Sequence, residues 1–594
     1  MKVTARSKEN ATALVVTMLI IFMITVGIGI ATNITTFTVR QTDSSRDFSA
    51  LRSASEGALD FGYGVLAKAI DNNSGPVANL VLALATATSP TFTNFSYKQP
   101  LVVQGTDQYG APAGLLSSLV PPPAIRINLD NYPGWVGSNT GYVASVTLGG
   151  NFIGKRAVNY GVKRAYNYTV VPLFQATAFF EDDLELFRPA TMTIGGLVHT
   201  NSKAYVSSSS SGTLTFSGNL SYSANNGYLD NVDPPQASTW SGYKANSEIP
   251  PTYSNGGQAQ QVDQVARIEP LGKDASTLIN TTDASRNNDA MRELIEPPDT
   301  YIDPVTQKIT SAPASTDPPT IASRRLYNKA GIRIRVAGTN AVPIITVTPN
   351  VAKGTALTAS QITTITSALT QQTIYDRRED QNVDVTSLDI SKVKDTLEKA
   401  SGFNNILYID DVRSNGSDPK AIRLVNGDKL PAGGLTLASE NPVYIQGDYN
   451  TNGNRVSSAV FADAVTILSN SWVDGNSSAA LSSRIASDTT VNTAIVAGFL
   501  PSGWTNPATG ATYGYSGGLN NFPRFLENWS GHTFTYTGSM IELFTSGIAT
   551  GEWDTGATYV PPVRKWNFDS NFVDNPPPGS LDAVSINRGP LVRF

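Results

Sequence analysis

The sequence predicts an α+β fold, mainly β, in which one long N-terminal helix precedes a strand-rich region. Residues 10–39 contain no charged side chain, and the centre of this stretch, residues 13–31, is almost wholly apolar. Only 15% of the 594 residues are charged, and the chain holds 49 Gly and 35 Pro beside abundant Ser, Thr and Asn. Those residues favour turns and short strands over long helices.

The apolar stretch predicts a membrane-spanning helix. At the rise of an α-helix, residues 13–31 would cross roughly 28 Å of hydrocarbon. Lys2, Arg6 and Lys8 precede it, which predicts a cytoplasmic N-terminus and an exported remainder, with residues 72–594 outside the inner membrane. The predicted membrane-facing side chains are Ala13, Leu14, Val15, Val16, Leu19, Ile20, Ile21, Phe22, Ile24, Val26, Ile28 and Ile30.

Two simpler interpretations of this stretch stay open. A cleaved secretory signal would use the small residues around Gly29-Ile30-Ala31, although the apolar run is longer than a usual signal core. A plain single-span anchor is the other. The helical pattern continues past the possible cleavage point and past the apolar stretch, because apolar residues recur every three or four positions from Phe48 to Ala69.

The order of these segments resembles the start of PilX-type minor pilins and their type II secretion relatives. The resemblance covers residues 11 to about 70 and is carried by the basic leader, the ALVV at residues 13–16, the apolar helix and the amphipathic stretch around Arg52–Ala58. Val15 stands where a mature chain beginning at Ala11 would carry that family's Glu. The resemblance implies a helix that sits in the inner membrane before assembly and packs against other pilin or pseudopilin subunits afterwards.

The resemblance also assigns the amphipathic stripe a role. We expect it to bury against the chain's own β region or against neighbouring subunits, and we expect Phe48 to lie beyond the reach of the folded region. The predicted helix assembly face consists of Phe48, Leu51, Ala54, Ala58, Phe61 and Val65.

Short strands separated by Gly, Asn and Ser predict a right-handed parallel β-solenoid, with a sandwich as the alternative. The predicted strands include residues 192–194, 197–199, 204–206, 214–216 and 220–222, then 435–437, 443–446, 459–461, 464–468 and 494–497. The phrases IGGLVHTN (194–201), NPVYIQGDYNT (441–451) and ADAVTILSNSW (462–472) resemble large PilX-like proteins whose exported part is β-helical.

The predicted organisation has six parts. They are a leader and helix at 1–70, a small β-rich unit at 76–170, a first solenoid-like segment at 171–224, an inserted loop-rich α/β segment at 225–435, a second solenoid-like segment at 436–550 and a Pro-rich tail at 551–594. Within them we expect a Gly149-Gly150 hairpin turn, helices at 283–295, 360–369 and 391–400, and no regular element in the tail.

No catalytic, cofactor or metal site is predicted. The acidic cluster at Glu181, Asp182, Asp183 and Glu185 is expected to be a solvated edge, since no calcium-loop spacing follows it. His199 is expected to be a packed residue. A polysaccharide-active enzyme could use four Asp residues, although nothing in their spacing demands it: Asp410, Asp411, Asp448 and Asp463. Three aromatic residues beside His532 could line a glycan groove or belong to the core: Trp529, Phe534 and Tyr536.

Function follows from the resemblance and the composition together. The chain is expected to be a structural, non-catalytic minor pilin-like component of a type IV pilus or a type II secretion pseudopilus, on the cell surface or pilus after assembly. The alternatives are a single-span anchored adhesin or glycan-binding protein, with a surface glycan as the further partner, and a polysaccharide-active enzyme. A net charge of −5 argues against a nucleic-acid partner, and the absence of Cys excludes disulfides.

Overall fold

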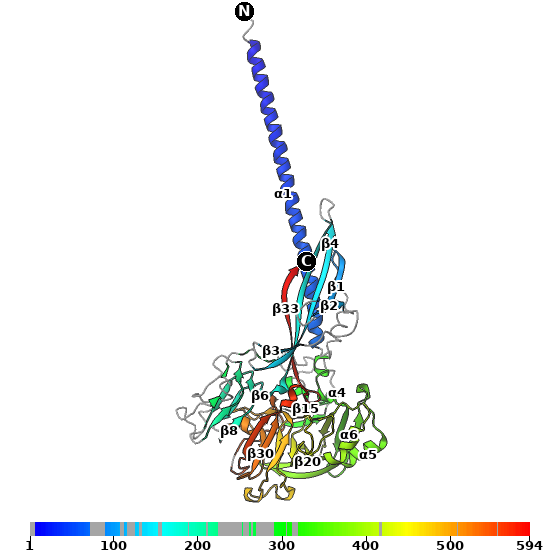
Figure 1. Ribbon diagram of the computed structural model, residues 1–594, viewed down its shortest axis with the longest axis vertical. Coiled ribbons are helices and arrows are strands. Elements are labelled where there is room, and N and C mark those ends of the chain that lie inside the picture. Colours follow the sequence, from blue (N-terminus) through cyan, green and yellow to red (C-terminus); the bar gives the residue numbers. More distant parts are fainter. Residues whose placement is uncertain are drawn as a thin grey trace, which may run out of the picture.

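The structure is a computed structural model of the chain (Figure 1). It describes residues 6–71, 90–106, 112–115, 125–129, 134–151, 157–187, 189, 191–208, 212–223, 252–253, 261–262, 265, 267–268, 290–303, 306–311, 319–414, 418–507, 509–554 and 556–594. The basic residue Lys2, the Pro run at 121–123 and most of the loop predicted at 225–264 lie outside these residues.

One helix, α1 (Arg6–Asp71), forms the long axis of the molecule (Figure 1). Its first half projects alone, and apolar side chains there are open on all sides, as at Phe22 and Phe37, which are 68% and 69% exposed. Its second half packs on a β-sheet. The prediction of an N-terminal apolar helix followed by a strand-rich region is confirmed.

The sheet beside α1 is antiparallel and has the order β2-β1-β4-β5-β33, with β3 also pairing with β4. Its strands are β1 (Ser96–Thr106), β2 (Pro112–Leu115), β3 (Ile125–Asn128), β4 (Val136–Asn151), β5 (Ala157–Pro172) and β33 (Asp582–Arg593). Leu51 and Ala58 of α1 are buried against Val146, Val162 and Tyr166 of the sheet. We call α1 and this sheet the stem.

The prediction of a hairpin turn at Gly149-Gly150 is wrong. Both residues lie inside β4, where they pair with Asn159 and Val158 of β5. A Cβ at Gly149 would fall 2.5 Å from the Lys98 side chain, and one at Gly150 would fall 2.8 Å from the Phe95 ring. The two glycines therefore give those side chains room to lie over the strand.

The prediction of an irregular tail is also wrong. After β32 (Val563–Phe568) the chain returns to the stem, and β33 pairs antiparallel with β5 from Asp582↔Pro172 to Arg593↔Val162. The last residue, Phe594, donates its backbone N–H to Gly161 O (3.1 Å). Both the helix and the final strand of the chain therefore belong to the stem, and residues 173–581, the distal unit, are inserted between β5 and β33 (Figure 1).

Three sheets of stacked strands build the distal unit, and all pairs in them are parallel except the hairpins β17–β18 and β19–β20. The eleven-stranded sheet runs β14 (Gln261–Val262), β12 (Leu220–Tyr222), β9 (Leu197–Thr200), β6 (Ala176–Phe180), β31 (Met540–Thr545), β28 (Ala494–Phe499), β25 (Ser458–Ala462), β23 (Leu435–Ala438), β21 (Ile406–Asp411), β17 (Ile332–Gly338), β18 (Pro343–Pro349).

Two six-stranded sheets accompany it. One runs β13 (Thr252–Tyr253), β11 (Leu214–Phe216), β8 (Met192–Ile194), β32, β30 (Thr533–Gly538), β27 (Thr489–Asn492). The other runs β19 (Leu369–Asp376), β20 (Gln381–Asp389), β22 (Lys420–Val425), β24 (Val443–Gln446), β26 (Val465–Leu468), β29 (Pro523–Phe525). Smaller pairs are β7 (Leu184–Phe187) with β10 (Ala204–Ser207), and β15 (Thr300–Asp303) with β16 (Lys308–Ser311).

Burial on both faces explains why these strands read as continuous apolar runs rather than alternating ones. All five residues of β25 are buried: Val460 and Ala462 face one apolar cluster, and Ala459 and Phe461 face another. The first half of the distal unit meets the second half in the middle of the eleven-stranded sheet, where β6 pairs with β31. The ten short strands predicted from the sequence all occur, within one or two residues of the expected bounds.

Helices are few in the described part of the distal unit. They are α3 (Pro319–Ala322), α4 (Leu326–Lys329), α5 (Ala359–Ser367) and α6 (Ile390–Glu398), beside several short 3-10 turns. The helices predicted at 360–369 and 391–400 correspond to α5 and α6. The one predicted at 283–295 is described only from Ala290, where a 3-10 turn (Ala290–Leu294) stands in its place. Strands β17, β21 and β22 fall inside the segment 225–435, yet they pair into the same sheets as the later strands.

Candidate functional site

The exposed half of α1 is the first candidate site. Among the described residues it is the helix long and apolar enough to cross a membrane. Its threonine hydroxyls donate hydrogen bonds to backbone carbonyls four residues earlier: Thr25 Oγ1 donates to Ile21 O (2.7 Å) and Thr32 Oγ1 to Ile28 O (2.8 Å). These bonds satisfy the hydroxyl groups without water, as a hydrocarbon environment requires.

Hydrogen bonds tie the second half of α1 to the stem sheet. Tyr166 Oη donates to Leu59 O (3.0 Å), and Arg164 forms an ion pair with Asp60 (2.7 Å). Ser55 is fully buried and donates to Leu51 O (2.9 Å). Burial raises the pKa of Tyr166 to about 12, so this phenol stays protonated and keeps donating at any physiological pH.

The expectation that Phe48 lies beyond the reach of the folded region is wrong. Its ring packs edge-on against Tyr160 of β5 at a centroid distance of 5.3 Å, and the Arg593 guanidinium lies over it at 5.5 Å. The hairpin of β4 and β5 extends along α1 toward the N-terminus (Figure 1), which brings Tyr160 to this level of the helix. Phe48 is thus part of the contact between the helix and its own sheet.

The rest of the predicted assembly face divides in two. Leu51, Ala54 and Ala58 are buried against the stem sheet, whereas Phe61 and Val65 are half-buried. The first three side chains already have an apolar partner within the chain. An assembly role for the stripe stays a prediction, and the fully open apolar surface of α1 lies nearer the N-terminus.

The acidic cluster at 181–185 is a solvated edge only in part: Asp182 is exposed and Asp183 half-buried, whereas Glu181 and Glu185 are buried. Glu185 is 2% exposed and accepts hydrogen bonds from Ser502 Oγ (2.6 Å) and Ser516 Oγ (2.8 Å). Glu181 is 9% exposed and pairs with Arg267. These carboxylates were expected in solvent because their partners lie far away in the sequence.

Buried carboxyl groups make the stability of the distal unit depend on pH. Burial raises the pKa of Glu185 to about 6, and it raises that of Glu527, which accepts from Ser469 Oγ (2.7 Å), to about 7. In the folded state both pKa values exceed the ordinary glutamate pKa of 4.5. The folded state therefore binds more protons, so this stabilisation is complete below pH 4.5 and is lost as the pH rises through 6 and 7.

We expect the urea midpoint of unfolding to fall between pH 4.5 and pH 8, by an amount on the order of several kcal/mol in unfolding free energy. Replacing both groups, Glu185→Gln with Glu527→Gln, should reduce this dependence, whereas Glu552→Gln at an exposed position should leave it unchanged. A wild-type midpoint that rises over the same interval would contradict the assignment.

The other candidate residues make contacts within the distal unit. Asp410 pairs with Arg335 (2.6 Å), Asp411 with Arg413 (2.6 Å), and Asp463 with Arg292, while Asp448 accepts from Thr490 N (2.8 Å). His199 is fully buried between Ser221 and Asn201, so the prediction of a packed residue is confirmed. Trp529, Phe534 and Tyr536 are also fully buried, which places them in the core rather than in a glycan groove.

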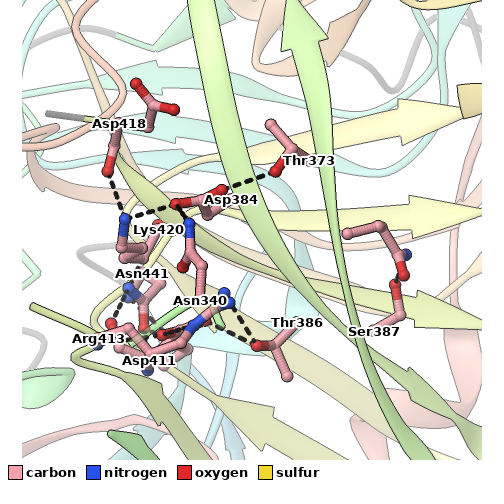
Figure 2. Close-up of polar contacts among 12 residues, drawn as sticks. Asn340, Thr373, Asp384, Thr386, Ser387, Asp411, Arg413, Asp418, Lys420 and Asn441 are labelled. Carbon is pink, nitrogen blue, oxygen red and sulfur yellow. Dashed lines mark hydrogen bonds and ion pairs between the residues drawn. The ribbon is translucent and has the colours of Figure 1, made fainter. Parts of the chain in front are cut away.

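A second candidate site is a polar cluster that sequence reasoning missed (Figure 2). At its centre Asp384 of β20 accepts hydrogen bonds from Lys420 of β22 and from Asn340, which lies between β17 and β18. These residues stand 36 and 44 positions from Asp384 and form no local motif. No sequence signal could have found the cluster, because parallel stacking of β20 on β22 brings Asp384 opposite Lys420.

Beside it lies a cavity of about 120 Å³, lined by Lys308, Asp411, Arg413, Asp418 and Lys420 among others. Arg413 makes a two-point contact with Asp411 and also reaches Thr386 Oγ1 (3.4 Å). Among the described residues, no group of three or more His, Asp or Glu side chains could hold a metal ion. Within the cluster Asp384 pairs with Lys420 and Asp411 pairs with Arg413.

Comparisons with known proteins add little. No family model and no curated protein matches the sequence. A solved structure with some likeness is the crystal structure of the competence-associated pilin ComZ from Thermus thermophilus, at 10% sequence identity, covering 85% of this chain and 89% of that chain. The TM-score is 0.27, which is too low to carry an argument about this chain.

Proposed function

We propose that this protein is a membrane-anchored, pilin-like structural component of a type IV pilus or a related secretion pseudopilus. The observation that carries the proposal is the division of α1 into a free apolar half and a half that packs on an antiparallel sheet. The free half fits a bilayer before assembly and a bundle of neighbouring helices afterwards. Other pilin or pseudopilin subunits are the partners that such a surface requires.

The distal unit would then be displayed by the stem. We propose that its three sheets of stacked parallel strands form a β-solenoid, right-handed as the sequence suggested, and that it lies outside the inner membrane. A structural role is supported by the use of Asp411 and Asp463 in buried ion pairs, since each carboxylate is held by a buried arginine that stays charged.

The variant Phe37→Asp tests whether α1 assembles with other subunits as well as anchoring the protein in the membrane. Phe37 is 69% exposed and lies beyond residues 13–31, which remain long enough to span a hydrocarbon core of about 30 Å. We expect the variant to reach the membrane fraction at the wild-type level. Its recovery in sheared surface filaments should fall by roughly tenfold or more, since burying an unpaired carboxylate between helices costs several kcal/mol.

Gln41→Asp is the matched control, because Gln41 is an exposed polar position on the same helix. It should change neither membrane targeting nor filament recovery. If Phe37→Asp enters filaments as well as wild type, or if wild type never does, the pilin-like proposal fails. A single-span anchored adhesin then becomes the better description.

A further inference from the structure

One carboxylate oxygen of Asp384 is shared by an amine and an amide (Figure 2). Lys420 Nζ lies 2.7 Å from Asp384 Oδ2, and Asn340 Nδ2 lies 2.5 Å from the same oxygen. The other oxygen, Oδ1, accepts a hydrogen bond from Thr373 Oγ1 (2.8 Å), which fixes the orientation of the carboxylate. Lysine and asparagine side chains are thereby held together by the group that could move protons between them.

Water is largely excluded from these groups, and their hydrogen bonds hold the pKa of Asp384 below its ordinary value, so the pair rests as an ion pair. The side chains of Lys420 and Asp384 are only 9% and 2% exposed, so bulk water has little access to the pair. Exclusion of water lowers the cost of forming a neutral amine and a neutral acid from an ion pair. Lys420 Nζ also donates to Asp418 O (2.8 Å), which restrains the amine after it loses a proton.

We propose that Lys420 and Asn340 become joined by an intramolecular isopeptide bond, with Asp384 as the catalytic acid and base. Lys420 passes a proton to Asp384 along their hydrogen bond, and the neutral Nζ attacks the Asn340 side-chain carbonyl carbon. A new N–C bond forms and the bond from that carbon to Nδ2 breaks. Asp384 returns this proton to the amide nitrogen, which leaves as ammonia, and the second proton that Nζ must lose passes through Asp384 to the ammonia, which departs as ammonium.

The step balances without an oxidant or cofactor. One lysine ammonium and one primary amide give one secondary amide and one ammonium ion, and Asp384 ends as it began. The cavity that borders Lys420 and Asp418 provides space for the departing ammonium. The reaction differs in this respect from disulfide formation, which this chain without Cys cannot use.

The bond would connect separate parts of the distal unit. Asn340 belongs to the hairpin at the end of the eleven-stranded sheet, and Lys420 opens a strand of a six-stranded sheet. A link from 340 to 420 therefore closes a long loop across two sheets, and closing a long loop restricts the unfolded chain most.

Peptide mapping of the full-length protein tests the proposal. Trypsin would normally release residues 336–353, which hold Asn340, and would cut after Lys420. We expect instead a branched species in which residues 336–353 are joined to residues 414–423, uncut after Lys420 and lighter than the sum of the two peptides by one ammonia. Linear peptide 336–353 together with cleavage after Lys420, in folded protein, would overturn the proposal.

Variants identify the role of each residue. Lys420→Arg keeps the charge opposite Asp384 but should leave residue 340 in a linear peptide. Asp384→Ala and the more conservative Asp384→Asn should also abolish the branched species although both reacting side chains remain. Lys394→Arg is the matched control: Lys394 pairs with Asp395 and Glu398 at the surface, and its loss should leave the bond intact. A branched species that persists in both folded Asp384 variants would contradict the catalytic role.

Discussion

Deleting residues 582–594 should unfold the stem while the distal unit stays folded. The deletion removes β33, which forms ten residue pairs with β5 between Asp582 and Arg593. At about 1 kcal/mol for each hydrogen bond, the loss is roughly 5–10 kcal/mol, which is comparable to the whole stability of a domain. Leu591, which packs on the apolar core between sheet and helix, is lost as well.

Hydrogen exchange of the full-length protein in detergent measures this effect. Amides of β4 and β5 should exchange rapidly in the deletion variant, while amides of β25 and β28 keep the protection of wild type. Deleting Phe594 alone is the control, because it removes one hydrogen bond to Gly161 and leaves the pairing of β33 intact. Undiminished protection of β5 without residues 582–594 would show that the final strand is dispensable.

Arg292→Ala should destabilise the distal unit by roughly 3–5 kcal/mol, because breaking a buried ion pair leaves an uncompensated charge. The Arg292 side chain is 2% exposed and pairs with Glu296 (2.7 Å) and with Asp463. Asp463 also accepts from the backbone N–H groups of Gly547 (2.7 Å) and Ala549 (2.7 Å). Arg292 thus neutralises the Asp463 carboxylate, which holds the loop at residues 547–549.

Arg455→Ala provides the comparison. Arg455 also pairs with an aspartate, Asp569 (2.9 Å), whose side chain is 1% exposed. The Arg455 side chain is 40% exposed, so water can replace it beside Asp569, which also keeps a hydrogen bond from Asn571 N (3.1 Å), and we expect a loss of about 1 kcal/mol. Thermal unfolding should therefore show a large fall in Tm for Arg292→Ala and little change for Arg455→Ala. Equal effects of the two variants would mean that burial does not govern the strength of these pairs.

Local sequence carries much of the strand pattern. Leu220–Tyr222 and Val443–Gln446 were predictable because each is a short apolar run closed by Gly, Asn or Ser, and a stacked strand needs little more. The apolar half of α1 was predictable from thirty residues without charge. These features depend on neighbours in the sequence, so a single sequence is enough to find them.

Long-range pairing accounts for what was missed. Asp582–Arg593 looked irregular because it belongs to a Pro-rich tail, yet β5 supplies a partner more than four hundred residues earlier in the chain. Glu185 looked exposed because its partner Ser502 is 317 residues away. The carboxylate shared by Asn340 and Lys420 depends on two strands of one sheet and the β17–β18 turn of another, which no local pattern specifies.

The insertion of the distal unit between β5 and β33 determines how the protein bears mechanical tension. The two connections leave the stem side by side, since Pro172 and Asp582 are paired. A pull on the distal unit therefore divides between two strands that move together, and it loads the long β4–β5 ladder in shear along its length. Many hydrogen bonds then resist at once instead of opening one after another. Drag on a displayed domain would be transmitted to α1 without peeling the stem apart.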